Sequence, residues 1–197
     1  MGRPPRYSAA AILDATAQLA AIHGPAGATV GAIAESLGAP TGSIYHRFGS
    51  KDALLAELWL QTVETFQIGF QAALSGTHPR EAGLEAALYT PRWVRSHPVP
   101  ARLLLLYRRE DFMPGGWPAE VVERAGELTA RGEASLRGFA RRALGSAGAS
   151  ALRRAQYAVV DLPYAAVRPH VHAGVPPPAD VDGLVAVAYR AVIPASS

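Results

Sequence analysis

Cysteine is absent from this sequence of 197 residues. A chain without a thiol cannot form disulfides, bind a metal through thiolate or use a cysteine nucleophile, and it suits a reducing compartment. Long hydrophobic runs are lacking as well, because no stretch approaches the roughly 18 apolar residues of a membrane-spanning helix. The first residues, MGRPPRYSAA, have no apolar segment behind their charges. We therefore expect a cytoplasmic protein without a membrane partner.

A large excess of charge is also missing. The formal net charge is +3 with a sequence pI near 9.5, and Lys51 is the only lysine among the 19 basic residues. Contact with a polyanion would therefore need a local basic patch and not a general field around the protein.

Sequence motifs of catalysis are absent too. The chain has no GxGxxG, Walker, GxSxG or HExxH motif. Glu110 and Asp111 are adjacent acids near an expected helix end, where such residues are ordinarily solvated. His170 and His172 have no third metal ligand close by in the sequence. We assign no catalytic residue, no metal and no cofactor, and we do not expect an enzyme.

Apolar residues recur every three or four positions along the chain, which is the spacing of amphipathic helices. No run alternates apolar and polar residues as a half-buried strand does. The fold class that we predict is all-α, with a wide apolar stripe on the long fourth helix and a proline-rich loop over 168–179. The expected helices span Ser8 to Gly24, Thr29 to Gly38, Thr41 to Gly49, Lys51 to Leu74, two pieces within 80–113, 119–144, 149–167 with a kink at Pro163, and 179–193.

The second and third helices, joined by the short link 38–40, form a helix-turn-helix. In the third helix Ile44 and Phe48 are four residues apart, so both can face the core while the other side chains point outwards. The outward set combines hydroxyl, phenol, imidazole and guanidinium groups around Gly42. A helix of this kind fits the major groove of DNA, where such groups reach bases and phosphates.

The stretch TVGAIAESLGAPTGSIYHRFGSKDALL, which begins at Thr29, resembles the helix-turn-helix of the TetR family of bacterial transcriptional regulators. The matching positions include Thr29, Gly38, Gly42 and Phe48, and the recognisable motif covers about residues 6–66. The resemblance implies about nine helices in two domains that the long fourth helix joins. They are a helix-turn-helix DNA-binding domain at 1–52 and an effector-binding and dimerisation domain at 53–197.

The resemblance also implies which residues meet DNA. Two positions depart from the family's pattern, because Pro40 replaces a frequent capping serine and Arg47 replaces a frequent histidine. The helix cap is therefore either Ala39, with proline in the first turn, or Thr41. Arg47 contacts either phosphate, which we favour, or guanine. The expected DNA contacts are Thr29, Thr41, Gly42, Ser43, Tyr45, His46, Arg47 and Lys51.

Arg3 and Arg6 form a short basic arm ahead of the first helix. An arm of this kind either enters the minor groove or stays a solvated tail. We favour the tail.

The C-terminal two thirds of the chain are rich in aromatic residues on helices interrupted by proline. Kinked helices leave gaps in which a pocket can form, although aromatic residues at helical spacing are more often plain core. The candidate pocket residues are Tyr89, Trp93, Leu104, Tyr107, Phe112, Trp117, Tyr157 and Tyr164.

Two helix-turn-helix units must be held about one turn of DNA apart to read a palindrome. The resemblance implies a homodimer that pairs its last two helices, where small and β-branched residues allow close packing. The candidate contacts are Leu152, Val159, Leu184, Val185, Ala188 and Val192.

We interpret the sequence as that of a dimeric repressor, which a small-molecule effector of unknown identity releases from a double-stranded DNA operator. One alternative is a regulator without an effector, or an activator. A different class of alternative is a helical enzyme or a partner-binding protein that does not bind DNA. Substitution of the DNA-facing residues separates these hypotheses, because only a DNA-binding protein would lose its function.

Overall fold

The computed structural model describes residues 7–112 and 117–193, and these residues form helices and no β-strand. The all-α prediction is confirmed. Within these ranges no helix combines the length and the apolar character needed to cross a lipid bilayer. The helices are α1 (Ala9–Gly27), α2 (Val30–Leu37), α3 (Thr41–Phe48), α4 (Lys51–Leu74), α5 (Pro79–Ser96), α6 (Pro98–Leu106), α7 (Arg109–Phe112), α8 (Ala119–Leu144), α9 (Ala149–Gln156), a π-helical turn (Tyr157–Asp161), α10 (Leu162–His172) and α11 (Asp180–Val192).

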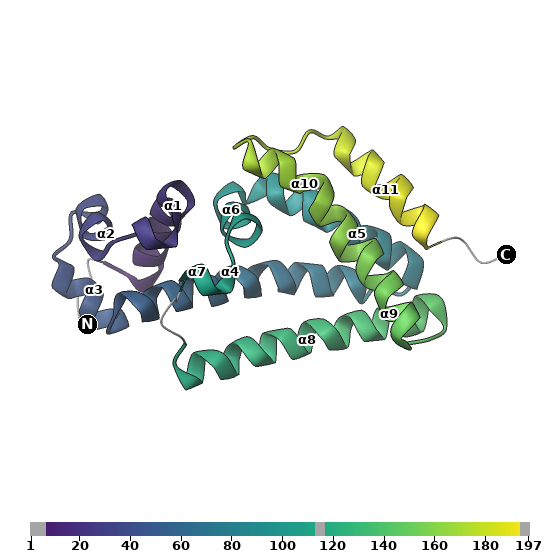
Figure 1. Ribbon diagram of the computed structural model, residues 1–197, viewed down its shortest axis with the longest axis horizontal. Coiled ribbons are helices and arrows are strands. Elements are labelled where there is room, and N and C mark those ends of the chain that lie inside the picture. Colours follow the sequence, from purple (N-terminus) through teal and green to yellow (C-terminus); the bar gives the residue numbers. More distant parts are fainter. Residues whose placement is uncertain (1–6, 113–116, 194–197) are drawn as a thin grey trace, which may run out of the picture.

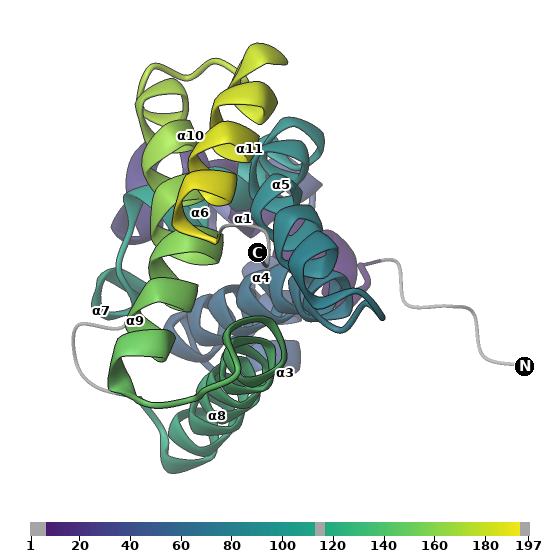
Figure 2. The same ribbon diagram turned by 90° about the vertical axis from the view of Figure 1, so that its right-hand side faces the viewer.

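The molecule is elongated, with α1, α2 and α3 at one end and α11 towards the other (Figure 1). α4 runs along this axis, and its 24 residues make it about 36 Å long. Both α5 and α8 pack against α4, and the end-on view shows them on different sides of it (Figure 2). The long helix therefore takes part in the packing of both ends.

Local backbone chemistry sets the start of the first helix as the sequence predicts, but the predicted end at Gly24 is wrong, because α1 continues to Gly27. Ser8 caps α1 by accepting a hydrogen bond from the Ala11 amide at 3.1 Å. Gly24 interrupts α1 with a φ of 76°, a value that favours glycine, and Pro25 follows it. Only one further helical turn, which ends at Gly27, lies beyond this kink.

α9, the π-helical turn and α10 form one continuous helix that reaches His172. The helix predicted at 149–167 is present, but it is longer than predicted. The loop predicted at 168–179 is therefore wrong in its first part, and the chain leaves the helix only after His172.

Two prolines are accommodated inside this continuous helix. Pro163 lies in the first turn of α10, directly after the wide π turn. Pro169 lies within α10, where proline removes one backbone donor. Ala165, whose carbonyl would accept that missing hydrogen bond, is exposed, so water can satisfy the carbonyl.

Buried side chains form two main cores and a smaller one between α4 and α8. The N-terminal core contains Ile12, Ile33 and Ile44 from the first three helices. It also contains Leu103 from α6 and Phe112 from α7. Helices that follow the predicted domain boundary by some 50 residues thus complete the core of the N-terminal part.

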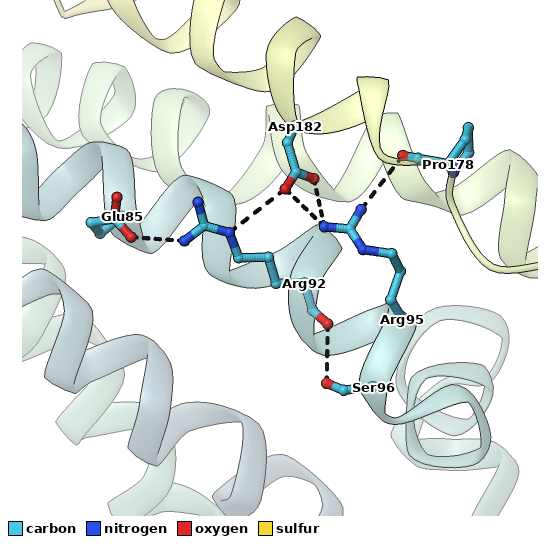
Figure 3. Close-up of polar contacts among 6 residues, drawn as sticks. All are labelled: Glu85, Arg92, Arg95, Ser96, Pro178 and Asp182. Atoms are coloured by element: carbon cyan, nitrogen blue, oxygen red, sulfur yellow. Dashed lines mark hydrogen bonds and ion pairs between the residues drawn. The ribbon is translucent and has the colours of Figure 1, made fainter.

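α11 is fixed on α5 by charged and polar contacts (Figure 3). One nitrogen of Arg95 donates to both carboxylate oxygens of Asp182 at 2.8 Å, and Arg92 Nε lies 3.6 Å from the same carboxylate. Further along α11 the Tyr189 hydroxyl donates to the Arg80 carbonyl at 2.8 Å. Burial raises the pKa of Tyr189 to about 12, so this donor keeps its proton at neutral pH.

Candidate nucleic-acid interface and apolar cavity

Backbone hydrogen bonds hold α2 and α3 at a fixed angle. Gly38 ends α2 in the left-handed conformation with a φ of 59°, and the Ala39 amide donates to the Ala34 carbonyl at 2.9 Å. The Tyr7 hydroxyl adds a hydrogen bond to the Gly38 carbonyl at 2.7 Å. The turn between the two helices is therefore tied to Tyr7, which comes just before the cap of α1.

α3 presents a polar face to solvent and buries an apolar one. Ile44 is buried in the N-terminal core, and Phe48 is half-buried against the same core. Among the predicted DNA contacts on α3, Ser43 is half-buried. The others are exposed, namely Thr41, Gly42, Tyr45, His46 and Arg47.

Pro40 is itself the N-cap of α3, so both caps considered from the sequence, Ala39 and Thr41, are wrong. Its extended backbone, with φ −66° and ψ 140°, suits the cap position. The proline ring offers no acceptor, and no side chain in the described part of the protein caps α3. A Cβ added at Gly42 would meet no atom within 4 Å. The start of α3 is therefore an open stretch of backbone with the partial positive charge of a helix N-terminus.

Thr29 and Lys51, the two predicted phosphate contacts outside α3, each make an internal hydrogen bond. Thr29 Oγ1 accepts from the Ala32 amide at 3.2 Å, which leaves the hydroxyl proton available to donate. Lys51 Nζ donates to the Ala26 carbonyl at 2.8 Å. An ammonium group has three donors, so Lys51 ties the start of α4 to the end of α1 and keeps donors for an anion. The predicted arm of Arg3 and Arg6 lies outside the described residues.

An apolar cavity of about 330 Å³ lies between α4, α5, α6, α8 and the π-helical turn. A second cavity of about 180 Å³, the inner cavity, is its neighbour. Four side chains line both cavities and thus form the wall between them: Phe66, Thr90, Leu104 and Val160.

Phe66 is the centre of an aromatic cluster in this wall. Its ring centroid lies 5.1 Å from that of Trp93 in an edge-on arrangement. Tyr89 is at 5.5 Å and Phe70 at 5.7 Å. The rings come from α4 and α5, so the packing of these two helices determines the shape of the cavity.

The structure brings half of the eight predicted pocket residues together. Trp93 and Leu104 line the inner cavity with Tyr164, and Tyr89 packs against Phe66. The prediction omits Phe66, although it is central to both cavities. The sequence signal for it is the apolar stripe of α4, which is wider than a single core contact requires.

The other four predicted pocket residues lie elsewhere, and these assignments are corrected. Phe112 is fully buried in the N-terminal core, against which Tyr107 also packs. Trp117 packs edge-on against Trp59 of α4 with 5.2 Å between ring centroids. Tyr157 is 53% exposed. The chain around α7 packs against α4, with Phe112 in the N-terminal core and Trp117 against Trp59.

Comparison with known protein families agrees with the geometry of α2 and α3. The model of the bacterial regulatory proteins of the TetR family matches residues 12–58, a region that includes the whole helix-turn-helix. The N-terminal part of the chain belongs to the TetR family. The protein is therefore a DNA-binding transcriptional regulator. Comparison with curated proteins gives no match.

Solved structures of TetR-family regulators share the fold over nearly the whole chain. FadR from Bacillus subtilis, solved with stearoyl-CoA, has a TM-score of 0.72 at 16% identity, over 96% of this chain and 100% of FadR. PfmR from Thermus thermophilus has a TM-score of 0.71 at 18% identity, over 94% of this chain and 98% of PfmR. A TetR-like regulator from Rhodococcus sp. RHA1 has a TM-score of 0.70 at 19% identity, over 99% of this chain and 100% of that regulator. At these identities the likeness establishes the fold and not a ligand.

The predicted dimer contacts occupy different environments. Leu184 is 66% exposed on α11, and Val187, which the prediction omits, is 67% exposed one turn later. Val159 and Val185 are buried in the chain's own C-terminal core, so assigning them to a contact between copies is corrected. The remaining candidates are half-buried, namely Leu152, Ala188 and Val192.

The acidic pair Glu110 and Asp111 and the histidines His170 and His172 do not line either cavity. Asp111 Oδ2 accepts from the Arg108 amide at 2.6 Å at the start of α7, and Glu110 lies 3.4 Å from Arg109. Within the described residues no group of three His, Cys, Asp or Glu side chains is arranged to hold a metal ion.

Proposed function

We propose that this regulator binds a palindromic operator as a dimer and that a small molecule in the apolar cavity releases it. The observation that carries the proposal is the position of α6. Leu103 of α6 is part of the N-terminal core, and the next residue, Leu104, lines both cavities. A molecule in the cavity thus touches a helix that also supports the helix-turn-helix.

For the DNA contact, α3 enters the major groove with its exposed face. Gly42 lets the backbone approach the base edges, while Thr41, Tyr45 and His46 meet bases and phosphates. Arg47 and Lys51 contact phosphate. Because Thr29 keeps a hydroxyl proton to donate, it binds phosphate at the start of α2. This role places the protein in the cytoplasm, where bacterial DNA lies.

For the dimer, the exposed side of α11 meets the same surface of a second copy. Leu184 and Val187 are three residues apart, on one face of α11, and both are exposed. A two-fold axis through such a face makes a self-complementary contact. The ion pairs of Asp182 with Arg92 and Arg95 fix the angle of α11, and with it the separation of the two DNA-binding ends.

For the release, the two states differ in the position of α6 and in the direction of α4. Arg102 of α6 donates from Nε to the Ala21 carbonyl of α1 at 3.1 Å and from a terminal nitrogen to the Val171 carbonyl of α10 at 3.3 Å. An effector that weakens operator binding about a hundredfold must favour the released state by about 2.7 kcal/mol. FadR, which has the same fold, is seen with stearoyl-CoA, which supports an apolar effector here as well.

The test is selection of binding sites from random duplex DNA with the purified full chain at two salt concentrations. Enrichment of a palindrome, with half-sites about one helical turn apart, supports the dimeric operator-binding protein. Weak binding that selects no sequence and disappears at the higher salt contradicts it.

A further inference from the structure

The cavity has an apolar body and an acidic opening. Its inner walls are formed by Phe66, Phe70, Leu136 and Val160. On the outer side it is lined by exposed residues of α8, Thr129 and Glu133 among them. The volume of about 330 Å³ is in the range of small-molecule sites in proteins.

The lining of the two cavities carries negative charge only, among the described residues. Glu133 is the only lining residue of the two cavities, among those described, that is charged at neutral pH. No lysine, arginine or histidine of the described chain lines either cavity. A carboxylate or a phosphate on a ligand would therefore meet a like charge and no cation.

Two arginines of α8 have carboxylate partners on α4, whereas Arg137, four residues after Glu133, is exposed and lines neither cavity. Arg124 donates to Glu57 at 2.7 Å, and Arg131 lies 3.7 Å from Glu64. Glu133, in contrast, has no ion pair or hydrogen bond within the described part of the chain. The one free charge on the cavity lining itself, among the described residues, is therefore negative.

A second carboxylate stands close to the cavity. Gln156 lines the cavity, and its amide nitrogen donates to Asp161 Oδ1 at 3.0 Å. Asp161 thus adds negative charge near Gln156, while the rings of Phe66 and Phe70 offer faces that attract a cation.

From these contacts we propose that the cavity takes an amphiphilic cation. The apolar chain of the ligand lies among Phe66, Leu104 and Leu136, and its amine or quaternary ammonium group lies beside Glu133. The inference rests on the proposed function in that it treats this cavity as the effector site. It differs from the case of FadR, whose ligand carries a negatively charged coenzyme.

The experiment compares three probes with the same ten-carbon chain: decyltrimethylammonium, decanol and decanoate, each below its micelle concentration. Binding to the full chain is measured by calorimetry and by the change in tryptophan fluorescence, since Trp93, one of three tryptophans, lines the inner cavity. We expect the ammonium probe to bind about tenfold more tightly than decanoate. Equal or tighter binding of decanoate, or no binding of any probe, would overturn the proposal.

Single substitutions test whether Glu133 causes the preference for the ammonium probe. Glu133→Gln should reduce the preference for the ammonium probe to within about twofold and leave decanol unchanged. Glu127→Gln is the matched control, because Glu127 is exposed on the same helix and does not line the cavity. Leu136→Trp should weaken all three probes by filling the cavity, which separates cavity binding from adsorption to the surface. An unchanged preference in Glu133→Gln contradicts the proposal.

The ligand measurements and the operator measurements test separate parts of the proposals. If the ammonium probe binds through Glu133 but leaves an operator complex intact, the ligand class stands and the release mechanism fails. If operator binding is found but the charge preference is absent, the ligand class fails and the DNA-binding function stands.

Discussion

Leu103 and Leu104 are consecutive residues of α6 that face different parts of the protein. Leu103 is 1% exposed in the N-terminal core with Ile12 and Ile44, whereas Leu104 lines the cavity between α4, α5 and α8. A change of α6 that accommodates a ligand at Leu104 therefore also moves a core residue of the DNA-binding part, because packed interiors leave little free space.

Gly42→Ala tests the approach of α3 to DNA. We expect an operator affinity at least about tenfold weaker, because the added methyl lies on the surface that faces the base edges. Stability should not fall, since alanine favours a helix over glycine by about 0.8–1 kcal/mol and the methyl would meet no atom within 4 Å. Fluorescence anisotropy at matched salt and urea unfolding measure the two quantities. Gly126→Ala, an equally open position on α8, is the control and should leave DNA affinity unchanged.

Lys51→Ala should affect both DNA binding and stability. The expected loss of one phosphate contact lowers the slope of log affinity against log salt by about 1. The lost hydrogen bond to the Ala26 carbonyl costs about 0.5–1.5 kcal/mol in the free energy of unfolding. Tyr45→Ala provides the contrast. Because Tyr45 is 50% exposed, this substitution should weaken DNA binding with little change in the free energy of unfolding. A salt slope equal to that of the wild type would remove Lys51 from the interface.

Leu184→Lys combined with Val187→Lys tests the dimer. Both side chains are about two-thirds exposed in the single chain, so the substitutions should leave its fold intact and place like charges across the two-fold axis. Analytical ultracentrifugation should show monomers, and operator affinity should fall with dimerisation. Val122→Lys on α8, an exposed apolar position outside α11, is the control. A double variant that stays dimeric places the interface elsewhere.

Arg102→Ala tests the link between the cavity and the helix-turn-helix. Arg102 lines neither of the two large cavities, so ligand affinity in the absence of DNA should stay within about twofold. The ratio of operator affinities without and with ligand should shrink, because the hydrogen bonds to Ala21 and Val171 are lost. Arg153→Ala, at an exposed position of α9, should keep the full ratio. An unaltered ratio in Arg102→Ala would leave α4 as the path of coupling.

Glu57→Gln tests a pH dependence of the free energy of unfolding. The hydrogen bond from Arg124 lowers the pKa of Glu57 below its ordinary value of 4.5. A depressed carboxyl pKa contributes stability above the unfolded-state pKa, and this contribution is lost as the pH falls through the folded-state pKa. We expect the variant to be about 0.5 kcal/mol less stable at pH 7, since the pair is partly exposed, and the difference to vanish in acid. Urea unfolding of both proteins from pH 7 to pH 3 measures it, and a constant difference would exclude the ion pair as its source.

The helix-turn-helix was predictable because local chemistry sets its limits. Ser8 and Thr29 cap the two helices that they precede, and Gly38 ends α2 with the positive φ that glycine allows. These effects depend on neighbours within about four residues, which sequence spacing shows directly. The cap of α3 at Pro40 was not predicted, because proline caps through its backbone and offers no side-chain signal.

The cavity and the dimer face were predictable only in part. Phe112 and Trp93 were both predicted to line the pocket, yet Phe112 is buried in the N-terminal core and Trp93 lines the inner cavity. The difference comes from the direction in which the chain turns at α7. Likewise Val185 is buried while its neighbour Leu184 is exposed, which depends on how α11 is rotated against α5.

The sequence by itself determined the all-α class, the starts of α1 and α2, the end of α2 and the kind of DNA-binding element, because each depends on local spacing and capping. The tertiary structure alone decided which aromatic rings surround the cavity, which face of α11 remains exposed and that α6 belongs to two parts of the protein. These features depend on long-range packing between helices, and for α11 also on the pairing of Asp182 with Arg92 and Arg95, which lie far apart from it in the chain.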